Sequence, residues 1–330
     1  MTVFRAAAPV RLDFAGGWTD VPPFSAREGG VVVSAAIGLC AHAEVRPGGE
    51  GLRLVAEDLG AELDLPDEAA LDPTGPLSLL QAGLRMLPVG PCALTTRSDA
   101  PAGSGLGSSG ALDVALVGAL AAARNEVLDP GDIARLACRL EGVEAGIPGG
   151  RQDQFTASFG GFLRLGFRDP DATVEPLTLE DELLAELERR TVLVYTGASR
   201  FSGTTISRVM RAYKRGEPAV TGALHGIREV AERMAEALRH GDLAAVGTLL
   251  DTNWRHQLTL DPGMSTPPME RLGQAMRDVG ALGGKAAGSG AGGSMFFLGP
   301  DDPAPAVAAA RGMGMTILPV RWSSAGVRAC

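Results

Sequence analysis

The chain has 330 residues, 45% of them hydrophobic and 21% charged, with a formal net charge of −9. This composition excludes a disordered chain and is typical of a globular protein with one large domain or two. Because the basic residues are scattered along an acidic chain, we expect no nucleic-acid partner. No apolar run reaches the roughly 18 residues of a membrane span and the N-terminus resembles no signal peptide, so we expect a cytoplasmic protein with no membrane partner.

The four cysteines and four histidines are dispersed and form no C-x-x-C pair, so structural zinc is not expected. His256 lies close to Asp251 in the sequence, but no G-x-S-x-G motif completes a hydrolase triad. Zinc-dependent and triad-hydrolase functions are therefore disfavoured.

The N-terminal part of the chain predicts a mixed α and β unit. The pattern of apolar residues predicts strands at 3–14, 29–45 and 92–99, a hairpin over 52–65 and a helix at 77–86. Between the first two strands, the glycines and prolines of A-G-G-W-T-D-V-P-P-F predict a rigid loop that exposes an aspartate. From this loop alone, gripping a polar ligand and simply connecting two strands are equally good interpretations.

The stretch P-A-G-S-G-L-G-S-S-G-A-L, residues 101–112, predicts a phosphate-binding turn. Its glycines allow positive φ angles and a close approach of the backbone to a ligand, and its serines offer hydroxyl groups. Apolar residues recur at helical spacing behind it, so the turn precedes a helix N-terminus whose amides and dipole favour anions. The triphosphate tail of a nucleotide fits such a turn. The residues expected to bind it are Pro101, Gly103, Ser104, Gly105, Leu106, Gly107, Ser108 and Ser109.

Two other glycine motifs fit this stretch less well. Gly105, Gly107 and Gly110 match G-x-G-x-x-G, but no strand with an acidic end follows about twenty residues later, as a dinucleotide site requires. A Walker A loop needs Ser or Thr after its lysine, whereas Lys285 precedes Ala286. On this motif alone, a glycine-rich turn without a ligand also stays open.

Behind the first helix, Asp129-Pro130 predicts the start of a second helix over residues 133–145, which carries Glu141. We expect this helix to end at G-I-P-G-G-R-Q-D-Q-F and a strand to begin at the following Gly-Gly-Phe. Asp153 would then sit on a tight turn, where aspartate is common for purely structural reasons.

The composition changes after Phe167, where D-P-D predicts a linker and a domain boundary. The remaining segments alternate between helix and strand, which suggests an α+β unit. The expected helices are near 204–212, 223–238, 243–254, from 268 onwards and 305–311, and the expected strands are 191–195 and 315–322.

Three motifs occur in order along the chain: A-P-V-R-L-D-F-A-G-G-W-T-D, P-A-G-S-G-L-G-S-S-G and K-A-A-G-S-G-A-G-G-S-M-F-F-L. With Q-D-Q-F between the last two, they resemble the signature motifs of the GHMP kinases, the superfamily of galactokinase, homoserine kinase, mevalonate kinase and phosphomevalonate kinase. The resemblance spans nearly the whole chain. It implies an α+β fold with an N-terminal ATP-binding domain like ribosomal protein S5 domain 2 over 1–167. A ferredoxin-like C-terminal domain would cover 168–330, with ATP and substrate in the cleft between the two.

The resemblance also implies roles for individual residues. The second motif would wrap the triphosphate of ATP, while Ser109 and Glu141 would hold Mg²⁺, with Glu144 as the alternative ligand. Asp153 matches the catalytic aspartate of sugar kinases, and the chemistry agrees, because a carboxylate near the acceptor hydroxyl can take its proton. Arg11 would be the cation that keeps Asp153 ionised; without the resemblance it reads as a surface arginine at a strand end. The third motif supplies Gly288, Ser289, Gly290 and Gly292.

The acceptor side differs from that of galactokinases, which carry Glu-His just before Thr-Asp. Here Gly17-Trp18 precedes Thr19-Asp20, so galactose is not expected. The pattern resembles the branch of D-glycero-D-manno-heptose 7-phosphate 1-kinases and L-fucokinases. Trp18 at this position is similar to the fucokinases. The heptose kinases are resembled more closely in the chain length and in two stretches, Q-D-Q-F-T-A-S-F-G-G-F and Y-T-G-A-S-R. The expected acceptor-binding residues are Trp18, Thr19, Asp20, Gly150, Arg151, Gln152 and Arg200, of which the two arginines are candidate cations for a 7-phosphate.

We therefore expect an ATP- and Mg²⁺-dependent kinase that acts on the anomeric hydroxyl of a small-molecule sugar or sugar phosphate, as a monomer or homodimer. A heptose 7-phosphate is the first candidate, and L-fucose or another monosaccharide is the alternative. A rival of a different class is a non-catalytic sugar- and ATP-binding regulator on the same fold. Asp153, Arg11 and Glu141 favour catalysis.

Overall fold

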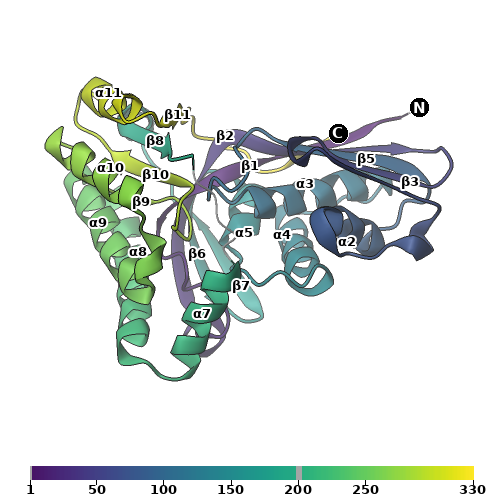
Figure 1. Ribbon diagram of the computed structural model, residues 1–330, viewed down its shortest axis with the longest axis horizontal. Helices are drawn as coiled ribbons and strands as arrows, with labels where there is room; N and C mark the ends of the chain where they lie inside the picture. Colours follow the sequence, from purple (N-terminus) through teal and green to yellow (C-terminus); the bar gives the residue numbers. More distant parts are fainter. Residues whose placement is uncertain (1, 198–202) are drawn as a thin grey trace.

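The computed structural model describes residues 2–197 and 203–330, which form two β-sheets with helices packed around them (Figure 1). The first sheet has eight strands in the order β12-β1-β2-β5-β3-β4, with β6 pairing to β2 and β7 to β6. Its strands are β1 (Phe4–Ala15), β2 (Gly30–Pro47), β3 (Leu52–Ala56), β4 (Ala61–Leu65), β5 (Cys92–Ser98), β6 (Phe162–Arg168), β7 (Asp171–Pro176) and β12 (Arg328–Ala329). The α+β prediction is confirmed.

The second sheet has four strands in the order β11-β8-β10-β9. They are β8 (Thr191–Tyr195), β9 (Gly283–Ala286), β10 (Ser294–Leu298) and β11 (Thr316–Leu318). The helices are α1 (Phe24–Glu28), α2 (Ser78–Met86), α3 (Ser108–Ala123), α4 (Pro130–Arg139), α5 (Gln152–Phe159), α6 (Asp181–Arg190), α7 (Gly203–Lys214), α8 (Pro218–Arg239), α9 (Leu243–Leu260), α10 (Pro267–Asp278) and α11 (Ala304–Gly312). Within the described ranges, no helix is long and apolar enough to cross a membrane.

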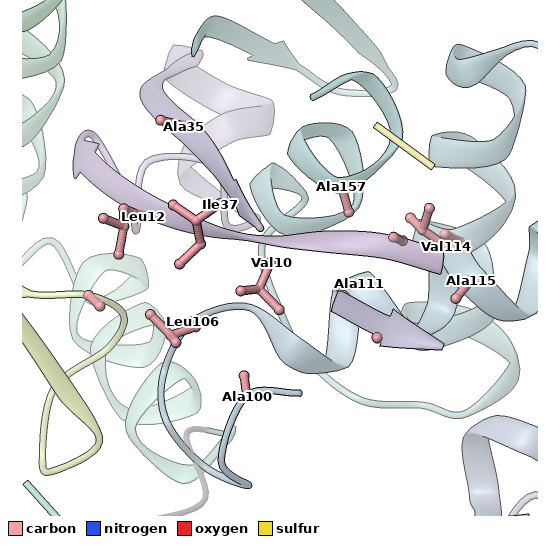
Figure 2. Packing of buried hydrophobic residues seen from close by; sticks show 14 of the residues in the cluster. Val10, Leu12, Ala35, Ile37, Ala100, Leu106, Ala111, Val114, Ala115 and Ala157 are labelled. Carbon is pink, nitrogen blue, oxygen red and sulfur yellow. The ribbon is translucent and has the colours of Figure 1, made fainter. Parts of the chain in front are cut away.

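The centre of the molecule is the pair β1 and β2, which is enclosed on both faces. Helix α3 packs against this pair from one side, and buried residues of α8 belong to the same core. Strand β1 is therefore buried almost throughout from Ala8 onwards, as expected for a strand covered on both faces. Figure 2 shows Val10 of β1, Ile37 of β2 and Val114 of α3 in this packing.

Helix α3 carries apolar residues around its whole circumference because strands and helices surround it. Its rigid position matters for function, since its N-terminus follows the glycine-serine turn directly. Leu106 of that turn is fully buried and lies in the core near Ala100 (Figure 2), so the turn is anchored from within.

The end of the chain returns to its beginning. Cys330 and Arg5 exchange two backbone hydrogen bonds of 2.8 Å, and β12 pairs with β1. The two termini accordingly lie along the same edge of the first sheet (Figure 1).

Most expected elements are present, and the exceptions have local causes. D-P-D, expected as a linker, is instead the turn of a hairpin in which Arg168 pairs with Asp171, so β7 extends the first sheet. The last expected strand is shorter, because β11 ends before Pro319, which has no N–H to donate. The short helices α1 and α5, and α6 in the glutamate-rich segment, were not expected. The division of the chain into domains 1–167 and 168–330 stays a prediction.

Candidate active site

A cleft of about 480 Å³ lies where the three glycine-containing motifs meet. Residues of the first sheet, of α3, of α5 and of the segment after β9 contribute to its wall. Side chains that line it include Arg11, Asp13, Trp18, Asp20, Ser104, Ser108, Ser109, Glu141, Gln152 and Asp153. The third motif contributes Gly288 and Ser289 to the lining.

The glycine-serine turn has the conformation expected of a phosphate-binding turn. Gly103, Gly105 and Gly107 have φ angles of 66°, 76° and 76°, in the left-handed region that disfavours other residues. The hydroxyl groups of Ser104 and Ser108 are buried without a hydrogen-bond partner among the described atoms. Because helix α3 begins at Ser108, the turn combines free hydroxyl groups with a helix N-terminus, which suits an anion.

Two residues predicted to bind ATP do not line the cleft. Leu106 instead points into the core, and its carbonyl oxygen accepts a 2.9 Å hydrogen bond from the Arg11 amide. Pro101 lies just outside the lining and accepts a hydrogen bond of 3.0 Å from the Ser104 amide, which closes the turn. Both residues shape the turn through their backbones.

The third motif packs against the second, backbone to backbone. A Cβ atom on Gly288 would lie 2.6 Å from the Gly105 carbonyl oxygen, and the Ser294 amide donates to the Ser104 carbonyl oxygen at 2.7 Å. Gly290 and Gly292, with φ angles of 79° and 124°, lie outside the cleft lining. These two glycines therefore shape the loop that supports the phosphate-binding turn.

Arg11 joins all three motifs. Its Nε donates to Asp153 Oδ1 at 2.8 Å, and its Nη1 donates to the carbonyl oxygens of Gly105 at 2.7 Å and Ala287 at 2.9 Å. The residue is only 5% exposed, so it is not a surface arginine. It holds the carboxylate of Asp153 in a fixed place relative to the phosphate-binding turn.

Asp153 lies in the first turn of α5, not on the tight turn that we expected. The glycines and the proline just before it obscured an eight-residue helix that buries Phe155 and ends at Gly160 with φ 72°. The helix brings Asp153 against the start of α3, where a Cβ on Gly110 would lie 2.5 Å from the Cβ of Asp153. Gly110 therefore makes room for Asp153 beside the turn.

Glu141 meets Ser109, as the metal-site prediction requires. It belongs to a π-helical turn, Leu140–Glu144, that continues α4, and such turns are frequent at functional sites. Ser109 Oγ donates to Glu141 Oε1 at 2.8 Å and Gln154 Nε2 donates to Oε2 at 2.7 Å. Burial raises the pKa of Glu141 to about 7.

Glu144, the alternative metal ligand, instead forms an ion pair with Arg139 at 3.0 Å and does not line the cleft.

The Ser109 and Glu141 oxygens fit Mg²⁺. This ion prefers oxygen ligands and typically uses one or two protein carboxylates together with water and phosphate oxygens. No group of three or more His, Cys, Asp or Glu residues that could hold a metal occurs in the described part of the chain. A single carboxylate and a hydroxyl beside the phosphate-binding turn suit an ion that arrives with the nucleotide.

Asp20 lines the cleft and is buried, with one carboxylate oxygen that has no hydrogen-bond partner among the described atoms. Its Oδ2 accepts the amides of Arg151 at 2.7 Å and Gln152 at 3.0 Å, whereas Oδ1 has no partner among the described atoms. Burial raises its pKa to about 6, against the lowering effect of the two amides. A side chain on Gly150 would collide with this carboxylate, so Gly150 makes room for it.

The neighbours of Asp20 in the loop have different roles. Thr19 is fully buried and its hydroxyl bonds to the carbonyl oxygens of Gly16 and Val31, so it holds the loop rather than reaching the cleft. Trp18 lines the cleft, is 6% exposed and has a positive φ of 86°. Its indole also packs in the cluster that contains Val209 of α7.

Of the two arginines expected to bind a 7-phosphate, the structure describes only Arg151. The guanidinium of Arg151 forms an ion pair with Asp169, donates to the Pro170 carbonyl oxygen at 3.0 Å and lies over the Phe167 ring. It does not line the cleft. Arg200 lies outside the described residues.

The buried ion pair of Asp13 and Lys285 was not expected from the sequence. Lys285 Nζ donates to the Asp13 carbonyl oxygen at 2.6 Å and to Asp13 Oδ2 at 3.0 Å, and Lys285 is fully buried. Two features of the sequence point to these residues. Asp13 stands two residues after Arg11 in a strand, which places both on one face, and Lys285 is a lone charge in a short apolar strand.

A cleft with these groups suits the transfer of a phosphoryl group to a hydroxyl, which depends on positioning and charge neutralisation. The protein is accordingly a phosphotransferase, and family models specify which kind. Residues 77–161 match the GHMP kinases N terminal domain and residues 234–312 match the GHMP kinases C terminal domain. The chain belongs to the GHMP kinase family and is a sugar kinase.

Several known proteins are similar over most of the chain. It is 33% identical to the D-glycero-alpha-D-manno-heptose 7-phosphate kinase of Campylobacter jejuni, with 90% of each chain covered. The bifunctional fucokinase/GDP-fucose pyrophosphorylase of Arabidopsis thaliana is 30% identical over 90% of this chain, but the match spans only 30% of that protein. The crystal structure of a D-glycero-D-manno-heptose 1-phosphate kinase from Bacteroides thetaiotaomicron has a TM-score of 0.81 at 26% identity, covering 99% of this chain and 98% of that one.

Proposed function

We propose that this sugar kinase phosphorylates the anomeric hydroxyl of D-glycero-D-manno-heptose 7-phosphate, with ATP as donor and Mg²⁺ as cofactor. The observation that carries the choice of acceptor is the 33% identity to a heptose 7-phosphate kinase over 90% of both chains. The contact between Asp153 and Arg11 beside the phosphate-binding turn supports the reaction.

In the proposed reaction, the anomeric oxygen of the sugar attacks the γ-phosphorus of ATP. The bond from that phosphorus to the β–γ bridging oxygen breaks, and its electron pair leaves with ADP. Asp153 takes the proton of the attacking hydroxyl. Arg11 orients this carboxylate and offsets its charge, so that it stays in place beside the anionic phosphates.

The triphosphate would be held by the turn from Gly103 to Ser108, with the hydroxyls of Ser104 and Ser108 as donors. Ser109 and Glu141 would hold Mg²⁺, which would neutralise charge on the phosphate oxygens. Because the guanidinium of Arg151 is paired with Asp169, we propose Arg200 as the cation for the 7-phosphate of the acceptor.

The proposal has three further parts. The chain would consist of an ATP-binding domain at 1–167 and a C-terminal domain at 168–330. It would act in the cytoplasm, as a monomer or homodimer. Besides ATP, its substrate would be a small-molecule sugar or sugar phosphate, and neither nucleic acid nor membrane would be a partner.

L-Fucose is the second candidate acceptor. The 30% identity to a plant fucokinase supports it, as does the indole of Trp18 at the wall of the cleft, which can pack against the apolar face of a sugar ring.

A coupled assay of ADP release tests the proposal. The panel would contain D-glycero-D-manno-heptose 7-phosphate, L-fucose, D-mannose, D-galactose and D-glucuronate, with Asp153→Asn as the negative control. We expect the highest kcat/KM for the heptose phosphate. A higher value for L-fucose would establish the second candidate. Sugar binding without ADP release from any acceptor would support a non-catalytic regulator.

A further inference from the structure

Three carboxylates line the acceptor side of the cleft, and each has a different partner. Asp153 is paired with Arg11, Asp20 accepts two backbone amides, and Asp13 is paired with Lys285. The first two have roles in the proposed reaction. The ion pair of Asp13 and Lys285 has no role in that reaction, although both residues are almost fully buried.

The ion pair of Asp13 and Lys285 links the two sheets. Asp13 lies near the end of β1 in the first sheet, and Lys285 lies in β9 of the second. Burying an ammonium group is costly unless it is paired and hydrogen-bonded, and burial lowers the pKa of Lys285 while Asp13 opposes this effect. Lys285 binds both the carbonyl oxygen and Oδ2 of Asp13, so it fixes the direction of the Asp13 side chain.

The other oxygen of Asp13 is nearly free. Asp13 Oδ1 has a long contact of 3.4 Å from the Gly17 amide, and the residue lines the cleft. A carboxylate oxygen can accept more than one hydrogen bond, so Oδ1 retains capacity for a donor from a ligand.

Gly17 makes room for this arrangement. A Cβ atom at position 17 would collide with Asp13 Oδ2 and would lie 2.9 Å from Gln152 Nε2. The side chains of Asp13 and Gln152 thus converge on the space that any side chain at position 17 would fill. Gln152 Oε1 is buried without a partner among the described atoms, as is Asp20 Oδ1.

From this geometry we propose that Asp13 binds the acceptor, and that its Oδ1, Gln152 Oε1 and Asp20 Oδ1 form one array of hydrogen-bond acceptors. The inference rests on the proposed function as a sugar kinase. These three acceptor oxygens select donors, so their ligand is a sugar that presents several neighbouring free hydroxyl groups. Lys285 is a positioning residue that aims Asp13, and Gly17 is the specificity-determining position.

The first test removes the ion pair without leaving a buried charge alone. Replacing a buried pair by neutral groups is often tolerated, whereas removing one partner is strongly destabilising. In the double variant Asp13→Asn/Lys285→Met, we expect the Kd for D-mannose and for D-glycero-D-manno-heptose 7-phosphate to rise about fivefold or more, because asparagine can still accept a hydrogen bond but carries no charge. The Kd of a non-hydrolysable ATP analogue should stay within about twofold. Calorimetric titration measures all three constants.

The second test uses Gly17→Ala, which leaves the ion pair in the chain but fills the space between Asp13 and Gln152. We expect a similar loss of sugar affinity with unchanged nucleotide affinity. The matched control is Gly222→Ala on the exposed side of α8, where a Cβ would meet nothing within 4 Å, and this variant should behave like the wild type.

The inference and the proposed function can fail separately. If the wild type binds sugars but releases no ADP, the proposed kinase reaction fails, while the titrations still test the acceptor array. Unchanged sugar affinity in both the double variant and Gly17→Ala would overturn the array. A wild type that binds no sugar of the panel would overturn both.

Discussion

The two sides of the cleft are built by different means. The proposed phosphate side is a continuous stretch of backbone, a turn of glycines and serines that runs into α3. The proposed acceptor side is an assembly of side chains from β1, the loop after it and α5. The first depends on local conformation, and the second depends on contacts between distant parts of the chain. Substitutions should therefore separate nucleotide binding from acceptor binding.

The largest expected effect is that of Asp153→Asn, which changes the group that stands between the two sides. The variant is nearly isosteric but cannot take the proton, so we expect a loss of about 10²–10⁴-fold in kcat. Affinities for ATP and for sugar should be retained, as measured by titration. Near-normal turnover would mean that another group is the base.

The sequence predicts the features that depend on local conformation better than those that depend on contacts between distant parts of the chain. The phosphate turn was predictable because Gly103, Gly105 and Gly107 need positive φ angles that few other residues adopt. The buried position of Arg11 was not predictable from its own strand, because its partners are as far away as Ala287. The ion pair of Asp13 and Lys285 spans a similar distance along the chain. Helix α5 was missed because it is too short to show a clear period.

The next largest effect is expected at the proposed Mg²⁺ site of Ser109 and Glu141. Glu141→Gln should raise the Mg²⁺ concentration needed for half-maximal rate by about tenfold or more, because few protein ligands hold this ion and little redundancy remains. Ser109→Ala should shift the same curve in the same direction. Glu144→Gln is the matched control, since Glu144 is paired with Arg139 outside the cleft. A shift for Glu144→Gln without one for Glu141→Gln would reverse the assignment.

On the acceptor side, Asp20→Ala should raise the sugar KM at least about tenfold, because a hydrogen bond to a charged acceptor contributes roughly 1.5–3 kcal/mol. The KM for ATP should barely change, because the hydrogen bonds of Asp20 go to Arg151 and Gln152 and not to the turn of Gly103 to Ser108. Initial-rate kinetics with each substrate varied in turn measure both values. Weakened ATP binding with unchanged sugar KM would contradict the separation of the two sides.

The smallest expected effect is a dependence of sugar binding on pH. Burial raises the pKa of Asp20 to about 6 from 3.8, so acidification through pH 6 protonates the oxygen that would accept a sugar hydroxyl. At pH 5 about nine-tenths of this group would be protonated, and the sugar KM should be up to about tenfold higher than at pH 7.5. Asp20→Asn should remove this part of the pH profile, and an unchanged profile would exclude Asp20 as its source.

Acidification should weaken sugar binding through Asp20, but it should increase the stability of the fold through the same residue. The folded protein binds a proton at Asp20 more tightly than the unfolded chain does, because the pKa is higher in the folded state. Ionised Asp20 therefore lowers the free energy of unfolding, increasingly as the pH rises from about 4 to 6 and by a constant amount above that range. Asp20→Asn should accordingly unfold at a slightly higher temperature than the wild type at pH 7, which differential scanning calorimetry can measure.

The most direct test of the account is to locate the phosphate that the protein transfers. After reaction of D-glycero-D-manno-heptose 7-phosphate with ATP and Mg²⁺, ³¹P and ¹³C NMR of the purified product identify the carbon that carries the new phosphate. The proposed reaction gives one new phosphate on the anomeric oxygen for each ADP released, and Asp153→Asn should form this product at least about 100-fold more slowly. A new phosphate on any other hydroxyl, or ADP release without a phosphorylated sugar, would contradict it.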